Sequence, residues 1–272
     1  MTTHREPWPP GTPAWPDLMV TDLAQAADFY AALFGWSFES APAPDGTTYL
    51  IASVDGRNAA GVGDVLPGPG DPAPEWTIYL ATRDLDVTVD TAVHAGATVL
   101  VPPMDAGDAG ALTVLVDPVG AVFGLWLSAT LTGVDVVDEP GAMTWCETMS
   151  HDDEAARDFY GTVFGYDYTD LSGPGFSYRT FSVEGRTAGG IGRLPSDGDD
   201  DVEPHWLIYF SVVDVDDAVA TAVGHGGGVV REPWDSAFGR IAVLSGPSGE
   251  TFAVHAELAT EAAGAQATDG PA

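Results

Sequence analysis

The sequence predicts an α+β protein built from four βαβββ modules, which lie in two tandem halves. Three observations support this fold class. The chain repeats itself with an offset of about 130 residues, each half repeats the order strand, helix, then three strands, and each expected helix follows an aspartate.

The duplication is seen when the chain is compared with itself. An offset of 130 aligns Asp28-Phe29-Tyr30 with Asp158-Phe159-Tyr160, and an offset of 129 aligns Pro118 with Pro247. So many matches in one register indicate a duplicated unit. The expected parts are a tail (1–13), a first domain (14–128), a linker with few apolar residues (129–142), a second domain (143–258) and a flexible tail (259–272).

The first half is expected to begin with a strand at Trp15–Val20 and a helix that Asp22 caps and Gly35 ends. Strands at Tyr49–Val54 and Asn58–Val65 then flank an Asp-Gly turn. The second module follows as a strand at Trp76–Thr82, a helix from Leu85 to His94, and strands at Thr98–Val101, Leu112–Asp117 and Val122–Leu127.

The second half repeats this order with small differences in length. Its first module is expected as a strand at Thr144–Met149, a helix at Glu154–Phe164, and strands at Tyr178–Val183 and Arg186–Arg193. Its second module is expected as a strand at His205–Val212, a helix at Val215–Val223, and a β region at Ile241–His255.

The charge of the chain excludes several classes of function. The net charge is −32, and the nine cations are all arginine because the sequence has no lysine. Such a surface repels nucleic acids and anionic membranes, and Schiff-base chemistry through lysine is impossible. Cys146 is the single cysteine, so no internal disulfide forms. With no apolar run of about 20 residues and no signal peptide, we expect a cytoplasmic monomer or homodimer that takes a small-molecule ligand.

Three short motifs resemble those of the glyoxalase/bleomycin resistance/dioxygenase family, the vicinal oxygen chelate superfamily, in its tandem actinobacterial glyoxalase-like form. They are Asp28-Phe29-Tyr30 with its copy, Leu33-Phe34-Gly35-Trp36 with its copy, and the turn Asp117-Pro118-Val119-Gly120. The resemblance covers the chain between Trp15 and Leu258. It implies two modules per half, whose mixed sheet curves around a shared cavity with the helices on the convex side only.

In metal-dependent members of that family, ligands come from the first and last strands of the modules. Here the corresponding positions hold Trp15, Thr77, Trp145, Leu207, Gly124 and Ala253. None of these is a good ligand for a divalent ion, which prefers imidazole, carboxylate or thiolate. We therefore expect no metal at the family positions, and no cofactor.

Strand periodicity predicts which side chains line the cavities instead, because residues two apart share a face. For the first half the expected ligand-binding residues are Trp15, Asp17, Glu75, Tyr79 and Trp126. For the second half they are Trp145, Met149, Leu207 and Tyr209, together with Glu147, His205 and His255. Aromatic pockets with a few polar groups are typical of small-molecule sites.

Three functions remain open at this point, one of which is a stress or structural protein whose cavities are filled by its own side chains. The first is a metal-free protein that binds an aromatic or apolar metabolite or antibiotic, as bleomycin-resistance relatives do. The alternative is an enzyme of the lyase, isomerase or dioxygenase type. It would use Glu147, His205 and His255 as catalytic residues, either for acid–base chemistry or as a facial triad for a divalent metal displaced from the family positions.

The two halves differ inside the predicted cavities. Glu75 corresponds to His205, and Trp126 corresponds to His255. Both changes introduce an imidazole that titrates near neutral pH, and the second also removes the larger indole ring. The second half is therefore expected to hold the functional cavity.

Overall fold

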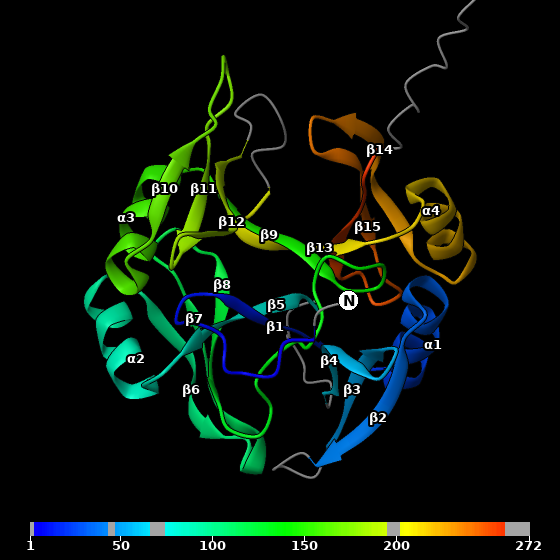
Figure 1. Ribbon diagram of the computed structural model, residues 1–272, viewed down its shortest axis with the longest axis horizontal. Coiled ribbons are helices and arrows are strands. Elements are labelled where there is room, and N and C mark those ends of the chain that lie inside the picture. Colours follow the sequence, from blue (N-terminus) through cyan, green and yellow to red (C-terminus); the bar gives the residue numbers. More distant parts are fainter. Residues whose placement is uncertain (1–2, 43–46, 66–73, 195–201, 259–272) are drawn as a thin grey trace, which may run out of the picture.

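The computed structural model describes residues 3–42, 47–65, 74–194 and 202–258. These residues form two eight-stranded mixed sheets, one from each half, and four α-helices (Figure 1). The first sheet has the order β2-β3-β4-β1-β5-β8-β7-β6, and the second has the order β10-β11-β12-β9-β13-β16-β15-β14. The predicted α+β class is confirmed. The predicted tail at 259–272 lies outside the described residues.

The first sheet contains two modules that meet where β1 and β5 pair antiparallel. Module one consists of β1 (Pro13–Val20), α1 (Leu23–Phe34), β2 (Ser37–Pro42), β3 (Thr48–Val54) and β4 (Arg57–Asp64). Module two consists of β5 (Trp76–Thr82), α2 (Leu85–His94), β6 (Thr98–Asp105), a 3-10 turn (Gly107–Ala109), β7 (Gly110–Val116) and β8 (Val122–Ser128).

The second sheet repeats this construction, and β9 and β13 pair antiparallel at its centre. Module three consists of β9 (Met143–Ser150), α3 (Asp153–Phe164), β10 (Asp167–Asp170), β11 (Tyr178–Val183) and β12 (Arg186–Arg193). Module four consists of β13 (His205–Ser211), α4 (Val215–Gly224), β14 (Gly228–Ser236), β15 (Gly239–Ser245) and β16 (Thr251–Ala256). The sequence had not located the edge strands β2, β10 and β14, and its β region at Ile241–His255 is two strands joined by a turn.

The helix termini form as the sequence predicted. Each aspartate before a helix accepts a hydrogen bond from the backbone N–H three residues later: Asp22 from Gln25, Asp84 from Val87, Asp152 from Ala155 and Asp214 from Asp217. Gly35 and Gly165 end α1 and α3 in the left-handed conformation, at φ 70° and 69°. Such caps satisfy backbone groups that the helix leaves free.

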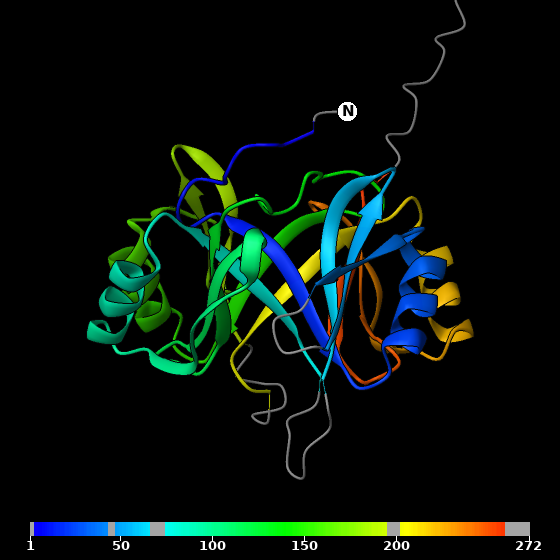
Figure 2. The ribbon, with the colours of Figure 1, turned by 90° about the horizontal axis from the view of Figure 1, so that it is seen from below.

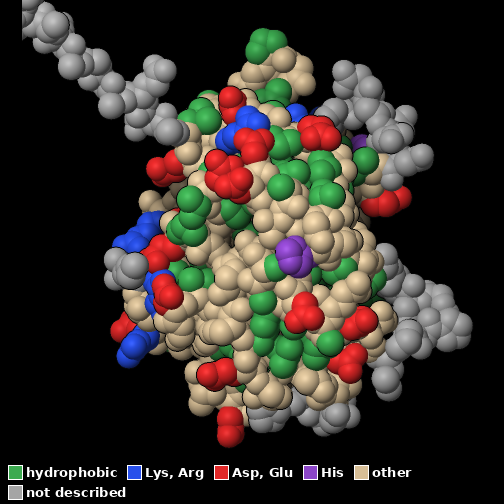
Figure 3. Space-filling view, turned by 90° about the vertical axis from the view of Figure 1, so that its right-hand side faces the viewer, with side chains coloured by type: hydrophobic (Ala, Val, Ile, Leu, Met, Phe, Trp, Pro, Cys, Tyr) green, Lys and Arg blue, Asp and Glu red, His purple; other side chains and the backbone are tan. Residues whose placement is uncertain are grey.

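The helices lie on the two flanks of the molecule, with the sheets between them (Figure 2). Helix α1 of the first half lies beside α4 of the second, and α2 lies beside α3. One core therefore joins the halves: Phe34 of α1 contacts Phe210 and Phe252 of the second sheet. Acidic side chains are scattered over the face that α1 and α4 form, with a few arginines among them (Figure 3). No described helix is long and apolar enough to cross a bilayer.

Two buried tyrosines connect the halves by hydrogen bonds. The Tyr30 hydroxyl donates to Glu250 at 2.8 Å, and the Tyr160 hydroxyl donates to Asp117 at 2.9 Å. Each hydroxyl also accepts a bond from an indole N–H of its own half, Trp76 or Trp206. The repeated Asp-Phe-Tyr motif thus fastens each helix to the opposite half.

The two carboxylates come from different positions of the equivalent turn. Asp117 accepts bonds from the backbone N–H groups of Val119, Gly120 and Ala121. The residue equivalent to Asp117 is Gly246, and a Cβ atom there would lie 2.0 Å from the Oε1 atom of Glu250. Glu250 therefore reaches back into the space that an aspartate side chain would fill, so Gly246 and Glu250 form a compensating pair.

The segment 129–142 packs against the first domain as well as connecting the two halves. Val134 and Val136 are buried, although the sequence suggested few apolar anchors here. The N–H of Val134 bonds to Ala14 at the start of β1, and its carbonyl accepts the indole N–H of Trp8 from the N-terminal segment. Linker and tail together cover one end of the first sheet.

Candidate functional site

A network of four side chains lies on the face of the second sheet that points away from the helices, called here its inner face. Glu147 on β9 accepts two hydroxyl hydrogen bonds, one on each oxygen: from Tyr178 at 2.5 Å and from Tyr209 at 2.7 Å. The indole N–H of Trp145 donates to Tyr178 at 3.0 Å. Burial, and then the charge of Glu147, raises the pKa of both tyrosines, so they stay protonated and hold the carboxylate in place.

A glycine on the intervening strand makes this network possible. Tyr178 lies on β11 and Glu147 on β9, with β12 between them. A Cβ atom at Gly190 on β12 would lie 2.0 Å from the Tyr178 hydroxyl. The tyrosine can therefore reach across the neighbouring strand only because residue 190 has no side chain.

An apolar cluster separate from the main core surrounds the network. Leu207, Tyr209 and Ala253 are its buried members, and the half-buried Trp145, Ile241 and Val243 pack against them. Their neighbours along the strands, such as Ile208 and Phe252, belong to the core under the helices. The alternation predicted from strand periodicity is present, and the inner face carries apolar groups that remain partly open to solvent.

The first sheet carries the same arrangement in a more closed form. The Tyr49 hydroxyl donates to Asp17 at 2.5 Å, and the Trp15 indole N–H donates to Tyr49 at 2.9 Å. A Cβ atom at Gly61 would lie 1.8 Å from the Tyr49 hydroxyl. Asp17 is 7% exposed. Burial raises its pKa to about 6, although the bonds from Tyr49 and Trp15 favour the charged form.

The two inner faces differ at the pair that the sequence singled out. Trp126 is buried, and its indole N–H donates to the carbonyl of Leu131 in the linker at 2.9 Å. His255 is half-buried, and its Nε2 atom lies 2.8 Å from the carbonyl of Phe238, to which it must donate. On the first inner face this position holds an indole that is bonded to the linker. On the second inner face it holds the smaller imidazole ring.

The structure does not bring Glu147, His205 and His255 together. His205 pairs with Met149 at the start of β13, and its Nδ1 atom bonds to the carbonyl of Glu203. His255 is level with Ser211, six residues further along the same strand, which corresponds to roughly 20 Å of extended chain. The hypothesis that these three residues form a facial triad for a metal ion is therefore wrong.

The other predicted residues take various positions. Trp15, Asp17 and Tyr79 lie together on the first inner face, whereas Glu75 is exposed ahead of β5. Met149 lies over Gly192, where an added Cβ atom would be 2.7 Å from the sulfur of Met149. The prediction missed Tyr49 and Tyr178. Their match at an offset of 129, together with the matching glycines 61 and 190, was the available signal.

The family's metal positions do not fit a metal in this chain. They hold indole, leucine, glycine, alanine and one threonine hydroxyl, none of which is an adequate donor. The nearby carboxylates of Asp17 and Glu147 are each bonded to tyrosine hydroxyls. Within the described ranges, no three His, Cys, Asp or Glu residues are grouped to hold an ion.

We expect protein purified without chelators to contain well under one equivalent of zinc, nickel, iron or manganese, because the donors are missing. Elemental analysis after dialysis measures this directly. Stoichiometric metal that is lost on replacing Glu147 or His255 would contradict the expectation.

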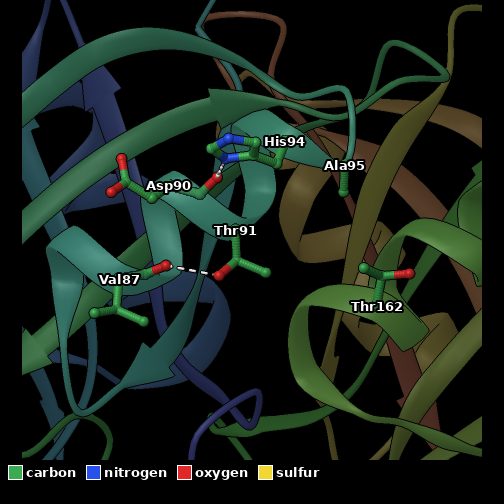
Figure 4. A pocket seen from close by; sticks show the side chains of 6 residues that line it. All are labelled: Val87, Asp90, Thr91, His94, Ala95 and Thr162. Atoms are coloured by element: carbon green, nitrogen blue, oxygen red, sulfur yellow. Dashed lines mark hydrogen bonds between the residues drawn. The ribbon is translucent and has the colours of Figure 1, made fainter.

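Two surface hollows lie away from the network. One, of about 410 Å³, lies between α2 and α3 and is lined by Val87, Asp90, Thr91, His94, Ala95 and Thr162 (Figure 4). In it the Nδ1 atom of His94 bonds to the carbonyl of Asp90, one helical turn earlier. The other, of about 300 Å³, is polar and lies between the N-terminal segment, the β3–β4 turn and the linker. Neither contains a residue that the sequence singled out.

Comparisons with known proteins agree with this fold. Residues 16–126 match the family model of a glyoxalase-like domain, and residues 142–254 match that of the Glyoxalase/Bleomycin resistance protein/Dioxygenase superfamily. A putative glyoxylase, CFP32, of Mycobacterium tuberculosis is 38% identical over 248 residues, which is 90% of this chain and 94% of that protein. The anthracycline biosynthesis protein DauV of a Streptomyces species is 36% identical over 258 residues, 90% of this chain and 93% of that protein.

Solved structures show the same architecture at low sequence identity. The Mn(II)-bound glyoxalase from Novosphingobium aromaticivorans superposes with a TM-score of 0.62 at 17% identity, covering 92% of this chain and 83% of that one. The 2,3-dioxygenase LapB from Pseudomonas sp. KL28 gives 0.60 at 15% identity, covering 91% and 92%. At such identities the likeness concerns the fold alone.

Proposed function

The chain belongs to the glyoxalase/bleomycin resistance protein/dioxygenase superfamily, and on that premise we propose that it binds a small organic molecule without using a metal. The ligand, an aromatic or otherwise apolar metabolite or antibiotic, would lie on the inner face of the second sheet. Two relatives whose names refer to a glyoxylase and to anthracycline biosynthesis support a role in small-molecule metabolism.

One observation carries this proposal: the polar network of Glu147 lies inside an apolar cluster that is partly open. Leu207, Tyr209 and Ala253 supply an apolar floor, and Trp145 adds an indole at its edge. Glu147 has a lone pair left on each oxygen after accepting its two tyrosine bonds. An apolar surface with a few fixed polar groups is what small-molecule sites present.

The first sheet supports the assignment by contrast. On its equivalent surface Trp15, Asp17, Tyr79 and Trp126 are buried, and the indole of Trp126 is hydrogen-bonded to the linker. The second inner face is thus the more accessible of two surfaces with a common design, as the sequence comparison of the halves had suggested.

A matched pair of substitutions tests the proposal. Ile241 and Leu112 are half-buried, occupy equivalent positions and lie on the inner faces of the second and first sheets. We expect Ile241→Lys to weaken binding of the neutral fluorescent probe N-phenyl-1-naphthylamine at least tenfold, because a charged side chain would interrupt the apolar floor. Leu112→Lys should change the affinity less than twofold.

Fluorescence titration gives both affinities, and near-UV circular dichroism confirms that each variant is folded. Equal effects of the two substitutions would contradict the proposal, as would wild-type protein that does not bind the probe. Binding that is lost only in Leu112→Lys would place the site in the first half.

A second candidate function is metal-free acid–base catalysis by Glu147. Its support is that two tyrosine hydroxyls hold this carboxylate on an accessible apolar face, as a general base requires. Wild-type protein would then exchange the α-protons of an aromatic ketone with deuterium oxide, an exchange that NMR detects. Glu147→Gln would abolish the exchange while leaving probe binding intact.

A further inference from the structure

An arginine stacked on a tryptophan also lies on the inner face of the second sheet. Arg231 on β14 pairs with Val243 on β15, and Trp234 on β14 pairs with Ile241. Because paired residues share a face, Arg231 and Trp234 lie on the same side as Val243 and Ile241, both members of the apolar cluster. The guanidinium carbon of Arg231 lies 3.7 Å from the centroid of the Trp234 ring.

This arginine differs from six of the other eight, which each form an ion pair with a carboxylate. Arg57, Arg179, Arg193 and Arg240 each lie within 3 Å of a carboxylate oxygen. Arg231 has no ion pair with any described residue, although the chain holds 41 acidic residues. Its stacking on Trp234 leaves the edge of the guanidinium, which carries the N–H groups, free to donate.

The first half supplies an internal comparison. Val101 on β6 pairs with Val114, and Met104 pairs with Leu112, with register shifts at the same points as in β14. Val101 and Met104 are thus the structural equivalents of Arg231 and Trp234. The duplicated strands share their backbone pattern, and only the second has a stacked arginine.

The register places this cation at one end of the apolar surface. Arg231, Val243, Ala253, Tyr209 and Trp145 are successive partners across five neighbouring strands. Burial, and then the charge of Glu147, raises the pKa of Tyr209, and the positive charge of Arg231 lowers it. Four strand spacings, roughly 19 Å along the sheet, separate Arg231 from the strand that carries Glu147.

We propose that Arg231, held by Trp234, is a specificity-determining residue that selects an organic anion: an aromatic or apolar molecule with an acidic group at one end. The acidic group would accept hydrogen bonds from the guanidinium, and the apolar body would lie over Val243, Ala253 and Tyr209. This inference rests on the proposed function, because it requires that the second inner face binds a ligand. A local cation is needed there, since the overall charge of −32 repels anions.

Two probes that differ by one acidic group test the inference: N-phenyl-1-naphthylamine, and its sulfonated analogue 1-anilinonaphthalene-8-sulfonate. Arg231→Gln should lower the affinity for the sulfonate roughly tenfold, the size expected for a charge-assisted hydrogen bond, and change that for the neutral probe less than twofold. Arg231→Lys should retain part of the sulfonate affinity. Arg83→Gln is the control, because it removes one exposed arginine charge elsewhere.

The outcomes separate this inference from the proposed function. If the neutral probe binds and Arg231→Gln changes neither affinity, or lowers both equally, the inference is overturned while the proposed function stands. If Arg83→Gln weakens sulfonate binding as much as Arg231→Gln does, the effect is one of overall charge and the inference again fails. If wild-type protein binds neither probe, both are refuted.

Discussion

Replacement of Tyr30 with phenylalanine is expected to lower the free energy of unfolding by about 3 kcal/mol, because it leaves two buried polar atoms, the Oε1 atom of Glu250 and the indole nitrogen of Trp76, without the hydrogen bonds that they make to Tyr30. The hydroxyl donates to Glu250, which is fully buried, and accepts from the indole of Trp76. A buried polar group that loses its partner costs more than an average hydrogen bond contributes. Chemical denaturation of the purified variant measures the loss.

Tyr168→Phe is the matched control. Its hydroxyl makes a partly buried hydrogen bond to the backbone carbonyl of Arg157, within one half, so its loss should cost about 1 kcal/mol. Tyr160→Phe should resemble Tyr30→Phe, because Tyr160 has the reciprocal contacts with Asp117 and Trp206. A Tyr30→Phe variant no less stable than Tyr168→Phe would show that the bonds between the halves contribute little.

Replacement of Asp17 with asparagine is expected to stabilise the protein near neutral pH. Burial raises the pKa of Asp17 from 3.8 to about 6. The folded state therefore holds this proton more tightly than the unfolded state, and the contribution of Asp17 to stability falls as the pH rises from about 4 to about 6. Above that window the charged carboxylate costs about 3 kcal/mol, which asparagine avoids.

The expected result is a difference in unfolding free energy, variant minus wild type, that is near zero at pH 4 and reaches about 2 kcal/mol at pH 7. This difference is smaller than the full cost of the charged carboxylate, because Tyr49 makes a weaker hydrogen bond to the amide of asparagine. All other carboxylates titrate in both proteins, so the difference isolates Asp17. Denaturation at several pH values gives the curve, and a difference that is independent of pH would refute the raised pKa.

Asp153→Asn should show the opposite sign. Burial alone would raise the pKa of Asp153, but hydrogen bonds from Ser177 and Arg193 and the nearby charges of Arg193 and Arg157 lower it overall. Its charged form therefore stabilises the fold above the ordinary pKa of an aspartate, and that stability is lost as the pH falls. The variant should be destabilised at pH 7 and less so near pH 3.

The sequence predicted the modules well because their boundaries are local. Asp22 and Gly35 cap and end α1 through contacts within a few residues, and the same holds for the other helices. The edge strands β2, β10 and β14 were harder to locate. They are short or largely exposed, so their residues lack the apolar alternation that marks a half-buried strand.

The candidate site was predicted only in part, because its contacts cross the sheet. Strand periodicity placed Trp145, Glu147 and Tyr209 on one face, and the structure confirms this. Tyr178 comes from two strands away, over Gly190, and a local pattern does not reveal which tyrosine will span a glycine. Contacts of this kind depend on strand order and register, which arise from the whole fold.

The triad of Glu147, His205 and His255 failed for a related reason. His205 lies two residues before the family position Leu207, and His255 lies two residues after Ala253. Strands β13 and β16 are parallel, so these shifts move the two imidazoles in opposite directions, by about 7 Å each. The residue types alone suggested a metal site, but the parallel direction of the two strands keeps the imidazoles apart.

The single core shared by α1, α4 and both sheets means that the chain is in effect a dimer fused into one polypeptide. In a homodimer of separate, identical subunits, every substitution appears twice, so both inner faces would have to close or open together. Fusion removes that constraint. The first half has Trp126 bonded to the linker, whereas the second half has His255, Arg231 and Trp234 on its inner face. In a fused dimer of this kind, a substitution on one inner face leaves the other face unchanged.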